Sequence, residues 1–536
     1  MKIFNINKNP LITVTLLFLL SFVFRMWDIT KQFEVWDETA TVRVGEIQLD
    51  YFRSGDFSKE SWSLINEHPP FSKYLFGSTR IVSMKVPYFR DIIDQDYPMG
   101  RRYTFQRITS AFIASISVLL VFLLARRFYD EKVGVLAALT LSFTPYFIAH
   151  SKVATQENLV SFLTLLATLL FFYAIKTQSI FNKLYILSGV TLGLAIATKY
   201  NAVFFLLLFF ILTIVNFKSI FKKDLKNIFK NRIILIPIIS FAVLYVLWPW
   251  LWPDPVGRFI ESISRVEESR YLEYFLGQFP SHHPWYYFFV YFFATTPPVI
   301  LFGVILFALK MIFQREKYDL WFMLYFLTPF LSVISPLKMD GIRYIFTIYP
   351  ALGIVNAIGY YWLIKTLKKF TQITFHQILD IAIPAIVVIT LIFTAILDHP
   401  YYWDYYNVFV GGPKNVYEKR LFDFGYWGEG LRKGFAFLYE EAKDDPKTVY
   451  LKIAPNHVVP PIKDNLKDIS EIERADYVII TPTGEWLDQI GLYLEYDFPE
   501  HFELVYEDGL SGTSVVSIYK RIEPYTGKIE TETNNE

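Results

Sequence analysis

Long, uninterrupted runs of apolar residues constrain this chain more than any other feature of its sequence. They recur between residues 9 and 397, and hydrophobic residues make up 53% of the 536 positions. A helix of roughly 17–25 apolar residues crosses the ~30 Å hydrocarbon core of a bilayer. The runs therefore predict a polytopic α-helical membrane protein with about eleven transmembrane helices. We place these spans at 9–27, 107–125, 133–150, 158–175, 184–199, 201–217, 233–250, 286–309, 319–337, 344–364 and 378–397.

The composition and the first span narrow the class of protein further. A net charge of +1 gives no reason to expect a nucleic-acid partner, and the absence of cysteine excludes disulfides and thiolate metal sites. The first apolar run, Leu11–Phe24, is followed by Arg25-Met26-Trp27-Asp28. A signal peptide would have small residues at its cleavage site there. We therefore expect this run to be retained as a membrane span.

Basic residues gather in alternate connections between the expected spans, and the positive-inside rule makes that side cytoplasmic. An odd number of spans then leaves the N-terminus in the cytoplasm of a multi-pass plasma-membrane protein. Three long segments are expected outside: a first loop, 28–106, a second loop, 250–285, and the tail from residue 398. The basic connections contain Lys2 and Lys8; Arg126, Arg127 and Lys132; Lys176 and Lys183; residues 218–232; Lys310, Arg315 and Lys317; and Lys365, Lys368 and Lys369.

The tail differs from the rest of the chain because it is charged and lacks long apolar runs. We therefore divide the chain into a transmembrane domain, 1–397, and an extracytoplasmic α/β domain, 398–536. The polar end, Thr526–Glu536, is expected to be disordered. The strands of the second domain are predicted at Val449–Ala454, Tyr477–Thr481, Phe502–Tyr506 and Ser514–Tyr519.

Two adjacent carboxylates, Asp37 and Glu38, open an amphipathic segment in the first outer loop. Apolar residues at 40, 44, 47 and 51 follow with the period of a helix, as suits a helix lying on the membrane. Carboxylates at a helix N-terminus also interact favourably with the helix dipole, which is the simpler explanation. The functional interpretation is a general base at the boundary between water and lipid. Because adjacent side chains on a helix diverge by about 100°, at most one of the two is expected to be that base.

Further ionisable residues lie in the outer loop and at the outer ends of expected spans. A charge near the bilayer centre costs up to ~3 kcal/mol unless it is paired or functional. Snorkelling to the interface explains any one such residue, but it explains a whole one-sided set less well. The adjacent His282 and His283 lack a further spaced ligand, so a divalent metal is compatible with them but not indicated. The set contains His68, Lys152, Glu157, Lys199, His283, Lys338 and Arg343.

One carboxylate and several cations facing a membrane fit the transfer of a sugar from a lipid phosphate. Such a reaction needs a base that deprotonates the acceptor hydroxyl. The departing phosphate needs positive charge and hydrogen-bond donors, in contrast to the second acid of a glycosidase. Lys199 and Arg343 would supply that charge, together with His283 or Lys338.

The order of these motifs resembles the GT-C superfamily of glycosyltransferases over nearly the whole chain. The resemblance is to prokaryotic members of the branch that contains the protein O-mannosyltransferases and lipid A aminoarabinose transferases. It rests on Asp37-Glu38, Gly55-Asp56, His68-Pro69-Pro70, Arg107, Lys152–Glu157, Gly193–Lys199, Pro284–Tyr287, Thr296-Pro297, Arg343-Tyr344, Pro350, Tyr405–Gly412 and Tyr426–Leu431.

The resemblance implies a GT-C fold, a polyprenyl-phosphate-linked sugar donor, inversion at the anomeric carbon and no cofactor. Asp37 would be the base on the acceptor side with Glu38 nearby, and Lys199 and Arg343 would line the donor phosphate. Glu157 occupies a position that is often Asp in relatives. The acceptor hydroxyl would belong to a protein, a lipid or a glycan. The sugar-binding repeat domain of eukaryotic protein mannosyltransferases is missing, which argues against a protein acceptor.

Two alternatives remain open at this point. A transporter or flippase of lipid-linked or anionic solutes would place ionisable residues near the middle of its spans, whereas these cluster at span ends. No internal repeat of the kind found in many transporters is evident. A metal-dependent oligosaccharyltransferase or ligase would lose its activity to a chelator.

Overall fold

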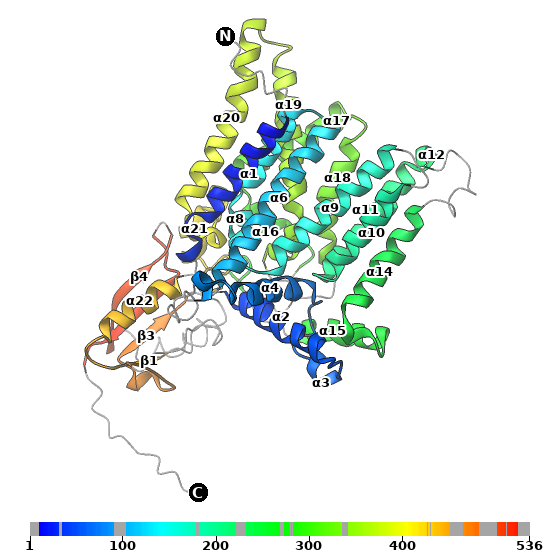
Figure 1. Ribbon diagram of the computed structural model, residues 1–536. Coiled ribbons are helices and arrows are strands. Elements are labelled where there is room, and N and C mark those ends of the chain that lie inside the picture. Colours follow the sequence, from blue (N-terminus) through cyan, green and yellow to red (C-terminus); the bar gives the residue numbers. More distant parts are fainter. Residues whose placement is uncertain are drawn as a thin grey trace.

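The computed structural model of the chain is a bundle of apolar helices with a small sheet domain at one end (Figure 1). The mostly helical fold and the C-terminal α/β domain predicted from the sequence are thereby confirmed. The structure describes residues 10–31, 35–90, 103–177, 182–220, 232–268, 273–278, 280, 282, 284–334, 341–425, 427–428, 430–450, 465–481, 501–510 and 512–523.

Every expected span contains at least one apolar helix. By length and composition, four described helices are able to cross a membrane, with a fifth if the pair bent by 66° counts as one span; six more apolar helices are shorter. The number of spans therefore stays a prediction. The bundle contains α1 (Pro10–Met26), α6 (Thr104–Phe128), α7 (Glu131–Ser142), α8 (Pro145–Ser151), α9 (Gln156–Thr177), α10 (Lys183–Ile196), α11 (Phe204–Val215), α14 (Leu235–Leu247), α16 (Tyr287–Thr295), α17 (Pro298–Phe313), α18 (Asp319–Leu327), α19 (Tyr349–Leu367) and α20 (Ile373–Leu397).

Prolines break two of the expected spans. The span 133–150 is divided into α7 and α8, with Pro145 as the first residue of the second helix. The span 286–309 is divided into α16 and α17 at Thr296-Pro297-Pro298. Proline lacks the backbone N–H that a helix interior requires and clashes with the preceding turn, so each helix restarts at its proline.

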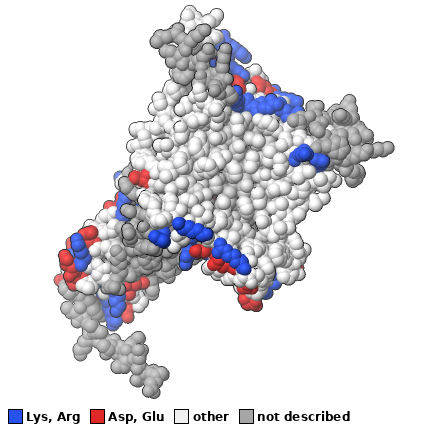
Figure 2. Space-filling view, in the orientation of Figure 1, with Lys and Arg blue, Asp and Glu red and all other residues white. Residues whose placement is uncertain are grey.

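Described basic residues from three of these connections lie together at the end of the bundle opposite the sheet domain (Figure 1). Nζ of Lys176 donates to the carbonyl of Arg127 at 3.1 Å, and Lys132 and Lys368 both pair with Asp380. Charged side chains appear at the two ends of the face in Figure 2, and the broad surface between them is almost uncharged. This belt is the surface expected of a membrane protein. Which end faces the cytoplasm stays a prediction.

Three helices lie across the other end of the bundle: α2 (Trp36–Ser54), α4 (Phe71–Ser83) and α15 (Pro255–Glu268) (Figure 1). The amphipathic helix expected at residues 40–51 is α2, but its buried face differs from the predicted stripe. Val44 is buried, whereas Ile47 is 38% exposed. The face against α4 is built on Gly45, where an added Cβ would lie 1.8 Å from the carbonyl oxygen of Lys73. Close backbone contact with Gly77 of α4 therefore replaces large apolar side chains at this crossing.

The C-terminal domain contains a five-stranded sheet of order β2-β1-β3-β5-β4. β1 pairs in parallel with β2 and β3, and β5 pairs antiparallel with β3 and β4. The strand β2 was not predicted, because its four residues include two charged side chains. The part of the first expected strand beyond Tyr450 and the tail 526–536 lie outside the described residues. The elements are α22 (Leu431–Glu441), β1 (Lys447–Tyr450), β2 (Leu466–Ile469), β3 (Tyr477–Ile480), β4 (Phe502–Asp508) and β5 (Val516–Arg521).

The segment between α20 and α22, residues 398–430, is called the linker here, and it packs into the bundle. The backbone N–H of Asn407 donates to the carbonyl of Ala294 at 2.8 Å, and its side-chain amide donates to that of Thr296 at 2.9 Å. The gap between α16 and α17 is thus filled by the linker, which satisfies backbone groups that the prolines left without helical partners. The hydrophobic cluster of the sheet domain begins at Leu431. The domain boundary after residue 397 stays a prediction.

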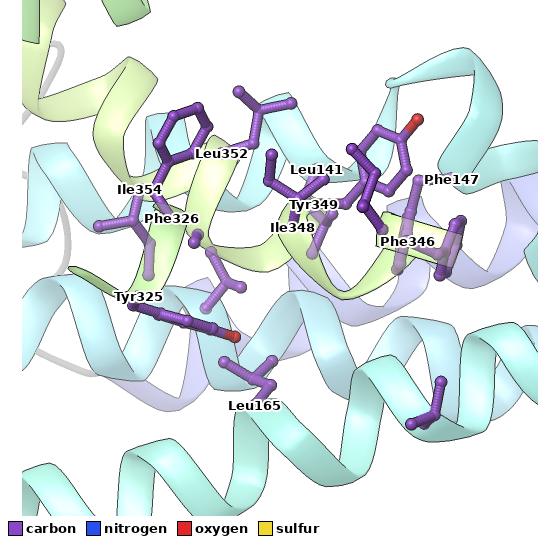
Figure 3. Close-up of a cluster of buried hydrophobic side chains, with 14 of the residues drawn as sticks. Leu141, Phe147, Leu165, Tyr325, Phe326, Phe346, Ile348, Tyr349, Leu352 and Ile354 are labelled. Atoms are coloured by element: carbon purple, nitrogen blue, oxygen red, sulfur yellow. The ribbon is translucent and has the colours of Figure 1, made fainter. Parts of the chain in front are cut away.

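An apolar core supports the short 3-10 helix η7 (Arg343–Ile348), which leads into α19. Phe346 stacks on Phe147 of α8 with ring centroids 5.8 Å apart. Figure 3 shows these two residues with Ile348, Tyr349 and their neighbours from α7, α9, α18 and α19. This packing fixes the position of Arg343 at the end of the bundle near α2.

Candidate active site

Five of the ionisable residues singled out in the sequence lie at the ends of helices on the side of α2 and α4. Asp37 stands in the first turn of α2 and Glu157 in the first turn of α9. His68 precedes α4, Lys199 lies between α10 and α11, and Arg343 begins η7. The structure brings these residues to one end of the bundle, although 306 positions separate the two most distant members.

Arg343 is the centre of an ion network. Its Nη2 donates to Oδ2 of Asp37 at 2.7 Å, and its Nε lies 3.3 Å from Oε1 of Glu157. Nζ of Lys199 donates to the same oxygen of Glu157 at 3.0 Å. Two cations and two carboxylates are therefore in direct contact. Oε2 of Glu157 is buried and has no hydrogen-bond partner among the described residues, so it is available to a bound ligand.

Backbone contacts hold the network together. The N–H of Phe71 at the start of α4 donates to the carbonyl of Ala197 at 2.8 Å, which attaches the segment after His68 to the turn that carries Lys199. The side-chain amide of Asn201 donates to the carbonyl of Tyr344 at 2.6 Å. The ring of Tyr344 also lies 4.4 Å from Nζ of Lys199. Lys199 and Arg343 are thus fixed on adjoining backbone.

The surroundings of His68 favour the neutral form of its imidazole. Burial and the positive charges of Lys73, Lys199 and Arg343 hold its pKa well below the usual value of 6.5. A neutral imidazole offers one hydrogen-bond donor and one acceptor but no positive charge. Lys73, which the sequence reasoning did not select, donates to the carbonyl of His68 at 3.0 Å, and burial lowers its pKa to about 8. The position of Lys73 in the first turn of α4, directly after His68-Pro69-Pro70, is the sequence feature that could have identified it.

Glu38 points to a different environment from its neighbour Asp37. Its carboxylate is fully buried and receives Nε and Nη2 of Arg107 at 2.8 and 2.6 Å. It also accepts the backbone N–H of Ala154 at 3.0 Å and of Val35 at 3.3 Å. Four donors occupy its two oxygens, and they join α2 to α6 and to the turn before α9. The contacts of Glu38 are therefore those of a structural carboxylate.

The remaining predicted site residues are not all in the network. Nζ of Lys152 donates to the carbonyl of Trp27 at 2.7 Å and lies 5.6 Å from the ring of Tyr402, which places it beside the end of α1 and the linker. His283 and Lys338 lie outside the described residues. Within the described part of the chain, no group of three or more His, Cys, Asp and Glu side chains forms a metal site.

A cavity of about 450 Å³, counting its open mouth, adjoins the network at Arg343. The guanidinium of Arg343 lies 4.9 Å from the ring of Trp427, another residue of the wall. Aromatic side chains and the carboxylates of Glu273, Asp404 and Asp423 make up much of the rest. Sequence reasoning missed this cavity, because its walls come from α8, η7, α16, the loop segment at Glu273 and the linker.

Comparison with known proteins supports the resemblance drawn from the motifs. The family "Dolichyl-phosphate-mannose-protein mannosyltransferase" matches residues 15–252, a part that contains Asp37, His68, Glu157 and Lys199. A search of curated protein sequences found no match. Over residues 15–252 this match agrees with the resemblance to protein mannosyltransferases.

Three solved structures are similar to this chain. ArnT from Cupriavidus metallidurans, bound to undecaprenyl phosphate, is 14% identical; the match covers 96% of this chain and 99% of ArnT, with a TM-score of 0.48. The oligosaccharyltransferase of Archaeoglobus fulgidus is 11% identical over 86% of this chain and 65% of its own, with a TM-score of 0.47. The Saccharomyces cerevisiae Pmt1-Pmt2 complex, bound to its sugar donor, is 17% identical over 47% and 34%, with a TM-score of 0.30.

Proposed function

We propose that this chain, which carries the protein mannosyltransferase family match of the GT-C superfamily over residues 15–252, is a membrane glycosyltransferase. It moves a sugar from a polyprenyl phosphate to a hydroxyl of a protein, lipid or glycan on the non-cytoplasmic face. The observation that carries the proposal is the contact of Asp37 and Glu157 with Arg343 and Lys199 at one end of an apolar bundle. This contact places a carboxylate that can act as a base beside two cations that can bind a phosphate.

Asp37 is the base in this proposal. Its carboxylate takes the proton of the acceptor hydroxyl as the acceptor oxygen attacks the anomeric carbon. The bond between that carbon and the phosphate oxygen breaks, and its electron pair leaves with the polyprenyl phosphate. Attack from the face opposite the leaving group inverts the anomeric centre. Glu38 takes no part in the chemistry, because its oxygens are occupied by Arg107 and two backbone N–H groups.

Lys199 and Arg343 stabilise the charge of the departing phosphate. Arg343 pairs with Asp37 and Glu157, and Lys199 pairs with Glu157. A bound phosphate competes with Asp37 for Arg343, and the carboxylate it displaces becomes free to accept a proton. Glu157 keeps both cations in place during this exchange. His68 adds a neutral hydrogen-bonding group, while Lys152, His283 and Lys338 remain candidates for the wider donor site.

The test uses the full chain in sealed proteoliposomes with a polyprenyl phosphate that carries a labelled sugar. We expect free polyprenyl phosphate to accumulate together with a labelled acceptor when an extract of surface glycoproteins and glycolipids is supplied. Movement of the intact donor across the bilayer without release of polyprenyl phosphate would instead identify a transporter. Loss of sugar transfer on chelation and its recovery with a divalent ion would identify a metal-dependent oligosaccharyltransferase.

A further inference from the structure

The cavity beside Arg343 has a charge opposite to that of a phosphate site. Three acidic residues line it, Glu273, Asp404 and Asp423. Among the described residues of its wall, Arg343 is the single lysine or arginine, and this guanidinium already contacts Asp37 and Glu157. A phosphate or carboxylate inside the cavity would be repelled by these acids, whereas a neutral or cationic group would not. The cavity therefore fits a part of a substrate other than its phosphate.

Asp404 indicates which chemical group the bound part of the substrate must have. It is 2% exposed, and its Oδ1 accepts the N–H of Gly425 at 2.8 Å. Its Oδ2 has no hydrogen-bond partner among the described residues. Leaving a buried carboxylate oxygen without a donor is costly. Burial accordingly raises the pKa of Asp404 to about 7. A ligand with a hydroxyl or ammonium donor would supply the missing partner.

Aromatic rings complete the wall in a way that suits a sugar. The rings of Trp403 and Trp427 have centroids 5.6 Å apart, and both line the cavity. The apolar faces of a pyranose ring pack on aromatic side chains, while its hydroxyls need a few well-placed acceptors.

We propose that this cavity holds the glycosyl group of the lipid donor, and that Asp404 selects a sugar ring that offers a hydrogen-bond donor and carries no negative charge. The inference rests on the proposed function, because Arg343 joins the cavity to the site assigned to the phosphate. It adds a specificity-determining residue from the linker, a segment that the family match over residues 15–252 does not include.

The test measures binding, so it needs no acceptor. Labelled polyprenyl-phosphate mannose bound to the purified full chain is displaced by polyprenyl-phosphate mannuronic acid or by bare polyprenyl phosphate. At pH 8, above the pKa of about 7 of Asp404, we expect the mannose donor to bind at least about 10-fold more tightly than the mannuronic acid donor, because Asp404 is then charged within the acidic wall. In Asp404→Asn, an isosteric change that can keep the contact with Gly425, this ratio falls to within about 3-fold, and binding of the bare lipid is unchanged.

Asp398→Asn is the matched control. Asp398 is another buried linker carboxylate whose Oδ2 has no hydrogen-bond partner among the described residues, and it is not part of the cavity wall. This variant should keep the wild-type ratio. Equal binding of the two sugar donors by the wild type, or an unchanged ratio in Asp404→Asn, would overturn the inference. So would an equal loss of selection in Asp398→Asn. Intact selection without sugar turnover would reject the proposed function alone.

Discussion

Replacing Glu38 by Gln is expected to destabilise the protein, in contrast to the same kind of change at Asp37. Glu38 is fully buried and neutralises Arg107, which is also fully buried. Breaking a buried ion pair by removing one charge costs about 3–5 kcal/mol, because the other charge stays in a low-dielectric environment. The amide of Gln also turns an NH₂ group toward one of the four donors that now face the carboxylate.

The assay is the half-life of the folded protein in detergent at a fixed elevated temperature, because large membrane proteins commonly unfold irreversibly. If a loss of about 3 kcal/mol appears wholly in the unfolding rate, the half-life shortens by about two orders of magnitude. The matched control is Glu46→Gln on the same helix. Its partner Arg43 is 55% exposed, and an exposed pair of this kind contributes about 0–1 kcal/mol.

Two results would refute the structural role of Glu38. One is a half-life for Glu38→Gln close to that of Glu46→Gln. The other is a Glu38→Gln protein that is stably folded, binds polyprenyl phosphate and yet has lost sugar transfer as completely as Asp37→Asn. The second result would make Glu38 the base and would reverse the assignment of the two neighbouring carboxylates.

Four further changes have defined outcomes. Lys199→Met should weaken binding of polyprenyl phosphate by about 10-fold or more, since charge-assisted contacts are worth about 1.5–3 kcal/mol; a binding titration that shows no change would contradict this role. Gly45→Ala should reduce both stability and transfer, because its Cβ meets the Lys73 carbonyl at 1.8 Å, whereas Arg43→Ala on the exposed side of α2 should reduce neither. Asp404→Asn should be more stable than the wild type at pH 8. Burial raises the carboxyl pKa from 3.8 to about 7, so the folded wild type loses stability as pH rises through this range, by at most ~4 kcal/mol, and the advantage of Asn should shrink toward pH 4 in thermal unfolding. EDTA should leave transfer in proteoliposomes unchanged, because Lys199 and Arg343 supply the charge that a metal would otherwise provide.

The parts of the fold that could be predicted are those determined by local sequence. Apolar runs of span length identify the bundle, because the bilayer requires them. Apolar patterns identify most strands of the C-terminal sheet. The strand β2 was not identified, because two of its four residues are charged. Pro297-Pro298 indicates the break between α16 and α17, which hydropathy alone does not detect.

The sequence indicates which residues belong to the candidate site, but it does not indicate how their side chains contact one another. The structure brings Asp37, Glu157, Lys199 and Arg343 into contact, as their common position at helix ends on one side of the bundle allowed. Arg107 on α6 pairs with Glu38, which leaves Asp37 to contact Arg343. Only the tertiary structure shows this approach of Arg107. Asp404 escaped notice since nothing in its local sequence distinguishes it from an ordinary linker carboxylate.

The central claim is that Asp37 removes the acceptor proton in transfer from a polyprenyl-phosphate sugar. The most direct measurement is the single-turnover rate of sugar transfer with prebound donor, compared between the wild type and Asp37→Asn. The loss of a general base predicts a rate lower by about 10²–10⁴-fold. Binding of polyprenyl phosphate should be as tight as in the wild type or tighter, because Arg343 no longer pairs with a carboxylate at position 37. A folded Asp37→Asn protein that transfers the sugar at the wild-type rate would contradict the account.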